Sequence, residues 1–478
     1  MVRSISRREF LGGAALVAAG TAIEACLPAG PRSQPTPSVG SVSPDPSGTV
    51  IPAAATVLRG ARVLTMDPHR PEAEAIAIAG EAITAVGSEA DVLAAAGPSA
   101  TIVDLAGGVV LPGFNDAHCH RIGDRDVGGF DSIEAAIDDA LAGGWTSISE
   151  LFVNQGRLDE LRALDQSSGL RIRVNCFFPV NYEFQQFGIW FGDYRPHQEF
   201  SPMLRVGGVK VFADSAWTNK MYMTEPHVDQ PGYRGEVYWA PDELTRLYRT
   251  LHDDGWSLAT HTCGDAAHDM VLDAYQAALA GADNAQHRHR IDHLMAVRDD
   301  QVQRMVDLGI LASFQLTWFT SGTTPDVEGT LGKERLPWVG RWRDLLAAGV
   351  PAVASTDYPW VDLAERDNTS GYPMKALSIA TTRSVGKGDV PKAWQAAQTI
   401  TVDQGLELMT RAGAWSTFEE DRKGSITAGK LADLVVLDAD PRRVALDDLA
   451  DVKVRMTLVG GNIEYCSPDA GTLCPTDR

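Results

Sequence analysis

Residues 206–214 read Val-Gly-Gly-Val-Lys-Val-Phe-Ala-Asp, a short apolar run that contains one lysine and ends at a carboxylate. It is the fourth of eight such runs along the chain. The runs cover residues 109–111, 146–149, 172–176, 206–212, 257–260, 290–293, 310–314 and 352–355. Helical periodicity lies between several of them, at residues 132–142, 242–253, 267–279 and 298–308. Eight strand–helix units over about 300 residues predict an α/β fold of the (β/α)8 TIM-like barrel type.

A doubly wound open sheet is the competing arrangement for alternating strands and helices. Its dinucleotide-binding members carry a glycine-rich fingerprint after an early strand. No early strand of this sequence is followed by such a fingerprint, and the barrel is therefore the favoured architecture.

Both ends of the chain are rich in short strand patterns instead. Residues 56–66, 75–78 and 82–86 form apolar runs separated by glycines, and residues 424–438 and 454–459 have the same character. We expect one small composite β-sandwich built from both termini. The predicted boundaries are 55–110 and 415–467 for the two parts of the sandwich, 111–414 for the barrel and 468–478 for a tail.

The first residues are typical of an export signal. Residues 6–11 read Ser-Arg-Arg-Glu-Phe-Leu and are followed by an apolar run rich in alanine and glycine, which resembles a twin-arginine signal over residues 1–30. Residues 31–54 are a linker rich in proline and serine. The protein is thus expected in the periplasm or cell envelope, either free or anchored through a lipid on Cys26. Export would also allow Cys466 and Cys474 to pair, with two free thiols as the alternative.

Charge limits the partners of the chain. The 42 Lys and Arg residues against 63 Asp and Glu residues give a net charge of −21. Binding to phosphates requires a positive surface, so a nucleic-acid partner is excluded and a small molecule is the expected substrate. The sequence leaves the oligomeric state open.

Five of the predicted barrel strands end at polar groups that can bind metal. These groups are His118 with His120, Lys210, His261, His293 and Asp357. Chemistry in such barrels lies at the carboxyl ends of the strands. Residues two apart in extended chain point to one face, so His118 and His120 can reach a single cation.

Lys210 lies inside an apolar run, where a charged amine is costly. Two interpretations remain open. Reaction with carbon dioxide would convert a neutral amine to a carbamate, an anion able to bridge two cations. Alternatively, Lys210 forms an ion pair with Asp214 or another carboxylate.

This set of residues resembles the amidohydrolase superfamily over nearly all of residues 56–460. The strings VLPGFNDAHCH, GVKVFADS, THTCGDAAHD and RHRIDHL, together with ITAGKLADLVVLD near the C-terminus, are most similar to amidohydrolase family 3. Characterised members of that family include N-substituted formamide deformylases. The resemblance implies two divalent metal ions, expected to be zinc. It places His118 and His120 on one ion and His261 and His293 on the other, with carboxylated Lys210 as the bridge.

The same resemblance implies a metal-dependent hydrolase that cleaves a non-peptide carbon–nitrogen bond of an amide, formamide or cyclic amide. A hydroxide bridging the metals would attack the carbonyl, with Asp357 and His293 as catalytic residues. One alternative is a lactonase or phosphotriesterase with the same metal centre. Another is a non-catalytic binding protein of the cell envelope.

Further residues are candidates for supporting roles. Glu150, at the end of the second strand, is an alternative metal bridge. Cys119 is expected to face away from the metals, while Cys263, His268 and His289 are interpreted as packing, surface or loop residues. Candidates to contact the metal ligands or the substrate are Asp265, Arg290, Trp217, Trp318 and Trp360.

Overall fold

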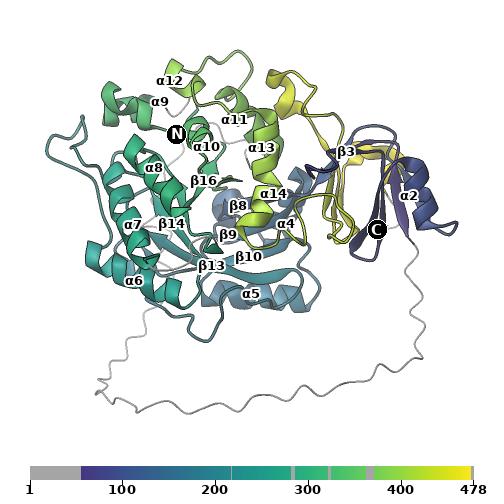
Figure 1. Ribbon diagram of the computed structural model, residues 1–478, viewed down its shortest axis with the longest axis horizontal. Helices are drawn as coiled ribbons and strands as arrows, with labels where there is room; N and C mark the ends of the chain where they lie inside the picture. The colour runs from purple at the N-terminus through teal and green to yellow at the C-terminus, as the bar shows by residue number, and fades with distance from the viewer. Residues whose placement is uncertain (1–54, 217, 281–285, 321–323, 362–370, 475–478) are drawn as a thin grey trace, which may run out of the picture. The chain divides into compact units, whose positions relative to one another are not determined.

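The computed structural model describes residues 55–216, 218–280, 286–320, 324–361 and 371–474. Eight parallel strands form one sheet, in which each strand pairs with the next along the chain. The strands are β8 Phe114–Cys119, β9 Trp145–Glu150, β10 Arg173–Pro179, β13 Leu204–Phe212, β14 Leu258–Thr262, β15 Arg290–His293, β16 Leu311–Gln315 and β17 Ala352–Ser355. The first and last of these strands also contact each other, and the sheet curls into the predicted barrel (Figure 1).

Helices follow the strands and cover the outside of the barrel (Figure 1). They are α3 Arg125–Gly128, α4 Ile133–Gly143, α5 Gln155–Gln166, α6 Pro241–Asp253, α7 Asp265–Ala278, α8 Asp299–Leu308, α9 Thr324–Leu331, α10 Trp342–Ala347, α11 Pro373–Thr382, α12 Ala393–Ala396, α13 Val402–Met409 and α14 Arg411–Ser416. The helical patterns read at 132–142, 242–253, 267–279 and 298–308 correspond to α4, α6, α7 and α8.

Local sequence sets the ends of these helices. In α4, the Ser132 side chain accepts a hydrogen bond from Ala135 N at 3.1 Å and so caps the first turn. Gly144 ends the helix with φ of +93°, and a Cβ there would come within 2.9 Å of Val435. Glycine is required by both conditions, because the chain must turn sharply into β9.

One strand of the barrel was assigned wrongly from the sequence. Residues 109–111 belong to β7 (Val109–Pro112), which lies in the β-sandwich, and the barrel begins at β8. The histidine motif that was expected to follow the first strand is therefore itself the first strand. The strand contains the polar residues Asn115, Asp116 and His118, yet it is buried at every position.

The sandwich is built from both ends of the chain, as expected. One sheet has the order β5-β4-β1-β6, and the other has the order β20-β19-β18-β7-β2-β3. The N-terminal strands are β1 Thr56–Arg59, β2 Arg62–Leu64, β3 Glu72–Ala73, β4 Ala75–Ala79, β5 Ala82–Gly87, β6 Thr101–Asp104 and β7, with helix α2 Glu89–Ala96 between β5 and β6. The C-terminal strands are β18 Leu434–Leu437, β19 Val454–Val459 and β20 Asn462–Cys466. Purple and yellow strands accordingly lie together in Figure 1.

Residues 468–474 are not a loose tail. Pro468–Leu473 forms a short 3-10 helix whose Ala470 and Leu473 pack in the sandwich core. A disulfide joins Cys466 to Cys474. Of the two alternatives left open by the sequence, the structure contains the paired form.

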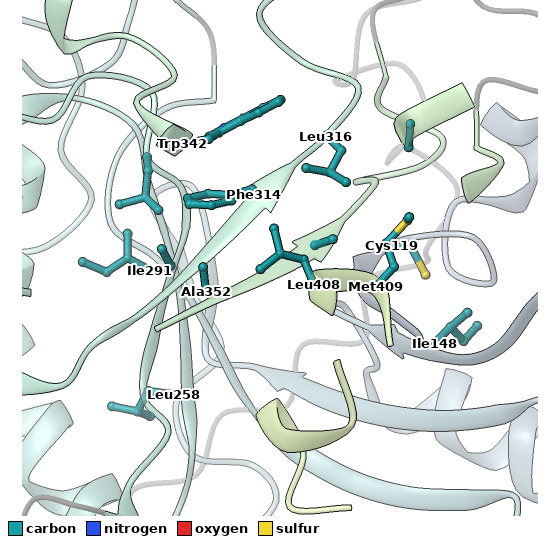
Figure 2. Packing of buried hydrophobic residues seen from close by; sticks show 14 of the residues in the cluster. Cys119, Ile148, Leu258, Ile291, Phe314, Leu316, Trp342, Ala352, Leu408 and Met409 are labelled. Carbon is teal, nitrogen blue, oxygen red and sulfur yellow. The ribbon is translucent and has the colours of Figure 1, made fainter. Parts of the chain in front are cut away.

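The main hydrophobic core lies between the barrel strands and their helices. Figure 2 shows part of it: the rings of Phe314 and Trp342 stack with centroids 5.9 Å apart, and Cys119 lies among the same apolar side chains. Cys119 thus faces outward from the barrel. No helix of the described residues is long and apolar enough to cross a membrane.

The interior near the amino ends of the strands holds a buried ionic network. Glu419 Oε2 lies 2.9 Å from Lys423 Nζ, and Glu419 Oε1 lies 3.5 Å from Arg205. Lys423 also donates to Ser147 Oγ. Burial by itself raises the pKa of Glu419, but Lys423 and Arg205 outweigh burial and bring it to about 2. The segment after α14 is thereby fastened beneath β9 and β13.

Replacing Glu419 with glutamine should lower the free energy of unfolding at pH 7 by about 3 kcal/mol, because a buried cation loses its partner. The pKa of Glu419 falls from 4.5 in the unfolded chain to about 2 in the folded one. Its stabilising contribution is therefore complete above pH 4.5 and is lost as pH falls toward 2. Urea unfolding of both proteins from pH 3 to 8 measures this difference. A difference that does not shrink at low pH would contradict the assignment.

Candidate metal centre

Two strands that meet at the barrel seam bring three metal-binding atoms together. His118 and His120 lie at the end of β8, and Asp357 follows β17. The Nε2 atoms of the two histidines are 3.3 Å apart, and Asp357 Oδ1 lies 3.0 Å from His118 Nε2 and 3.4 Å from His120 Nε2. Ligands around a tetrahedral zinc ion with bonds of about 2.0 Å are about 3.3 Å apart. The three atoms therefore have the spacing of donors that share one cation.

His293 and His261 extend this group from β15 and β14. The ring centroid of His293 lies 5.0 Å from that of His118 and 4.2 Å from that of His261. All four imidazoles are buried and follow one another in space across the ends of three strands. The convergence expected from the sequence is thus present in the geometry.

Unusual backbone angles aim two of these side chains. His293 has φ of +80° and Asp357 has φ of +58°, both in the left-handed region that residues other than glycine rarely adopt. Alternation along β15 would send His293 and its neighbour Asp292 to opposite faces. The positive φ changes the direction of the chain at His293, and both side chains face the centre.

Lys210 lies in the barrel interior with no exposed surface. Its Nζ is 3.3 Å from Asp292 Oδ2 and 4.9 Å from the centre of the Phe212 ring. Burial lowers the pKa of Lys210, against the opposing effect of Asp292. The ion pair left open by the sequence exists, but its carboxylate belongs to Asp292 rather than Asp214.

Asp214 is held by the backbone instead. It accepts hydrogen bonds from the N–H groups of Cys263 and Gly264 at 2.8 Å and of Tyr222 at 2.9 Å. A Cβ on Gly264 would lie 2.0 Å from Tyr222 O, so only glycine permits this approach. Burial raises the pKa of Asp214 to about 7 against the effect of these three bonds. Asp214 thus fixes the loop after His261.

Cys263 lies closer to the centre than expected. Its Sγ is 3.3 Å from His261 Nε2 and is fully buried. Together with Asp214 and His261 it forms a second group of atoms with metal-ligand spacing. Three N–H groups already donate to the Asp214 carboxylate, so we do not interpret this second group as a metal site. Its residues instead hold His261 in position.

Asp116 connects the first and last barrel strands. It accepts from Thr356 N at 3.0 Å, Thr356 Oγ1 at 2.6 Å and His118 N at 3.3 Å. Two backbone bonds cross the same seam, from Asp357 N to His118 O and from His120 N to Tyr358 O, each of 2.8 Å. This network sets the distance between the β8 histidines and Asp357.

Glu150 does not join the cluster. Its carboxylate accepts from Ile122 N at 3.0 Å and Gly123 N at 2.8 Å, and it lies 3.8 Å from Cys119 Sγ. Glu150 therefore points out of the barrel with Cys119 and fastens the loop that follows His120. Burial raises the pKa of Glu150 to about 6.

Several supporting residues have structural partners. Asp265 accepts from Thr224 N and Oγ1 and pairs with Arg298 at 2.7 Å, so it is a salt bridge rather than a substrate contact. Arg290 Nε lies 3.2 Å from Asp292 Oδ1, inside the barrel.

The three tryptophan candidates have different surroundings. The Trp318 ring stacks on His293 at 4.9 Å, and Trp360 Nε1 donates to Asp124 at 2.6 Å. Trp217 and Cys26 lie outside the described residues.

His268 and His289 are not surface histidines. Both are buried, and each has a backbone partner: His268 Nδ1 pairs with Gly264 O, while Leu258 N donates to His289 Nδ1. His268 lies on the buried side of α7, and His289 stacks on Tyr275 of the same helix at 5.3 Å.

The electrostatics of the centre suit a cation. Burial lowers the pKa of His293 to about 3 and that of His261 well below its usual value, so both imidazoles are neutral at pH 7. Burial by itself raises the pKa of Asp357, but His118 and the other histidines outweigh it and keep the carboxylate ionised. Asp357 raises the pKa of His120 against burial.

The donor set fits a resident metal by a second criterion. Asp357 Oδ1, which faces Nε2 of both His118 and His120, is buried without a hydrogen bond among the described residues. Buried polar atoms are rarely left without a partner. Imidazole and carboxylate ligands without thiolate are compatible with zinc and with other first-row divalent ions.

Sequence reasoning missed Asp116 and Asp292. Each precedes a recognised histidine, by two residues and by one, but an aspartate beside a histidine is common and carries little information. Only the three-dimensional pairing with β17 in one case and β13 in the other reveals their positions.

Clustered imidazoles and a carboxylate at the strand ends of a parallel barrel are the features of a barrel protein with a metal-binding site. Residues 129–465 match the model of the Amidohydrolase family, and the chain belongs to this family. The match begins after β8, so His118 and His120 precede it.

Two curated relatives are similar over much of the chain. Protein LONG AFTER FAR-RED 3 of Arabidopsis thaliana is 27% identical over 303 residues, which is 63% of this chain and 49% of that protein. N-substituted formamide deformylase of Arthrobacter pascens is 26% identical over 376 residues, 77% of this chain and 65% of that enzyme. The chain spans about half to two thirds of the length of the curated relatives it matches.

Solved structures share the fold. An uncharacterised metal-dependent hydrolase of Pyrococcus furiosus superposes with a TM-score of 0.67 at 19% identity, covering 81% of this chain and all of that one. A Xaa-Pro dipeptidase crystallised with bound methionine superposes with a TM-score of 0.58 at 15% identity, covering 86% of this chain and all of that one.

Proposed function

We propose that this protein is a metal-dependent hydrolase that cleaves a non-peptide carbon–nitrogen bond of a small amide, formamide or cyclic amide. The observation that carries the proposal is the cluster of His118, His120, His261, His293 and Asp357 at one end of the barrel. Family membership and the similarity to an N-substituted formamide deformylase support it.

His118, His120 and Asp357 would hold one cation, and His261 and His293 a second. Bound divalent ions supply an activated water and polarise the carbonyl that it attacks. Asp357 is the carboxylate best placed to accept the proton of that water and to deliver it to the leaving nitrogen. Its backbone N–H is tied to His118 O, so the carboxylate is held in position beside the histidines.

Aromatic side chains next to the centre favour an apolar or aryl substituent on the substrate. Phe212 packs on His261 at 5.2 Å, and Phe152 contacts Phe212, Tyr182 and Phe187 at 5.8 to 6.2 Å. Trp318 covers His293 on another side. These rings offer apolar area and few charges, so we expect a neutral substrate.

Removing the metal with a chelator should abolish amide hydrolysis, and adding zinc should restore it. The panel for this assay contains N-aryl formamides, cyclic amides, lactones, a phosphotriester and Xaa-Pro dipeptides. We expect kcat/KM for the best amide to exceed that for every other class by about tenfold or more. A lactone, phosphotriester or dipeptide as the best substrate would overturn the bond assignment. Metal binding without any turnover would support a binding protein instead.

We further propose that, when metal is bound, Lys210 leaves its ion pair with Asp292 and is carboxylated, as the family resemblance implies. Replacing Lys210 with alanine should then reduce the bound zinc from two ions per chain to one or none. Inductively coupled plasma mass spectrometry on purified protein measures this content. Lys423→Ala is the matched control, since Lys423 is equally buried but lies in the ionic network with Glu419. Unchanged zinc in Lys210→Ala would refute the bridge.

We also propose that the protein works in the periplasm or cell envelope. The paired Cys466 and Cys474 support an oxidising compartment, and the other cysteines of the described residues are buried.

Mass analysis of the exported protein tests this location. The expected mature chain has lost its first 25 to 30 residues and carries one disulfide, and a diacylglycerol on Cys26 would distinguish the anchored form from the free one. An intact N-terminus with reduced cysteines would contradict export.

A further inference from the structure

Asp292 contacts ionisable side chains from three strands of the barrel, β8, β13 and its own strand β15. It is fully buried on β15, in register with His261 of β14 and Ser313 of β16. Its Oδ1 is 3.2 Å from both His118 Nδ1 and Arg290 Nε, and its Oδ2 is 3.3 Å from Lys210 Nζ. One carboxylate thus contacts a histidine of β8, a lysine of β13 and an arginine of its own strand.

The contact with His118 sets the direction of that ring. A carboxylate beside Nδ1 favours the tautomer that carries its proton there. The lone pair of Nε2 then points to the position shared with His120 Nε2 and Asp357 Oδ1. Carboxylates in this arrangement orient metal-binding histidines and raise their basicity.

Arg290 is a second cation beside Asp292. The guanidinium is buried and lies 4.7 Å from the centre of the Phe177 ring, and Asp292 is the carboxylate that the structure pairs with it. Arg290 and Lys210 together therefore restrict where the Asp292 carboxylate can lie.

We infer that Asp292 is a positioning residue that fixes His118 for metal binding, and that Arg290 holds the Asp292 carboxylate in place. This inference rests on the proposed metal-dependent function, but it concerns two residues that do not themselves touch metal or substrate.

The test compares zinc affinity in the full chain, measured by competition with a chromophoric chelator. Asp292→Asn keeps the shape of the side chain and removes its charge, and its zinc affinity should fall about 10- to 100-fold. The visible spectrum of the cobalt-substituted protein should change as well, because the orientation of His118 alters the ligand field.

Asp433→Asn is the matched control. Asp433 forms a buried pair with Arg173, at 2.7 and 2.9 Å, at the other end of the strands. This variant should lose stability like Asp292→Asn but keep the zinc affinity and the cobalt spectrum of the wild type.

A double variant, Arg290→Met with Asp292→Leu, removes a buried cation together with the carboxylate, and Lys210 is the charged side chain left without its partner. Because burial lowers the pKa of Lys210, this amine can lose its proton, and the variant should fold even if Asp292→Asn does not. Its zinc affinity should show the same loss. Wild-type affinity, within twofold, in either folded variant would overturn the inference while leaving the proposed function intact. A wild-type protein that binds no divalent metal would instead overturn the proposed function and this inference with it.

Discussion

The hydrogen bonds of Asp116 across the barrel seam are the constraint on which the centre depends. They join β8 to the residues after β17, and the two strands carry His118, His120 and Asp357 between them. A small change in this seam would separate donor atoms that now lie 3.0 to 3.4 Å apart. The carboxylate is fully desolvated, and burial raises its pKa to about 6. Three donors on one carboxylate offset that cost and give the seam a single geometry.

Backbone strain is concentrated at the same place. Positive φ angles at His293 and Asp357 are each unfavourable by about 1 to 3 kcal/mol. Neighbouring hydrogen bonds hold the angle at Asp357: Asp357 N donates to His118 O, and Trp360 N donates to Asp357 O. The strain brings residues to the centre that a regular strand would turn away.

The strand order and most of the donor set were predictable from the sequence. Period-two spacing placed His118 with His120, and an apolar run around Lys210 indicated burial inside a barrel. The sequence could not show that β8, rather than β7, is the first barrel strand. The buried strand β8 contains several polar residues, whereas the sandwich strand β7 before it is apolar. Nor could it find Asp292, whose partners are 82 and 174 positions away along the chain (Lys210 and His118). Pairings of this kind depend on the closure of the barrel, which no local pattern records.

The sandwich has a consequence for how the protein is made. Strand β18 lies between β7 and β19, so a strand from near the C-terminus occupies the middle of a sheet begun by the N-terminal segment. On the ribosome, β7 can pair with β2 as soon as it is made, but its other neighbour, β18, does not exist until more than three hundred further residues have been added. The sheet can therefore be completed only after β18 to β20 have been synthesised, and until then the exposed edge of β7 needs protection from other chains.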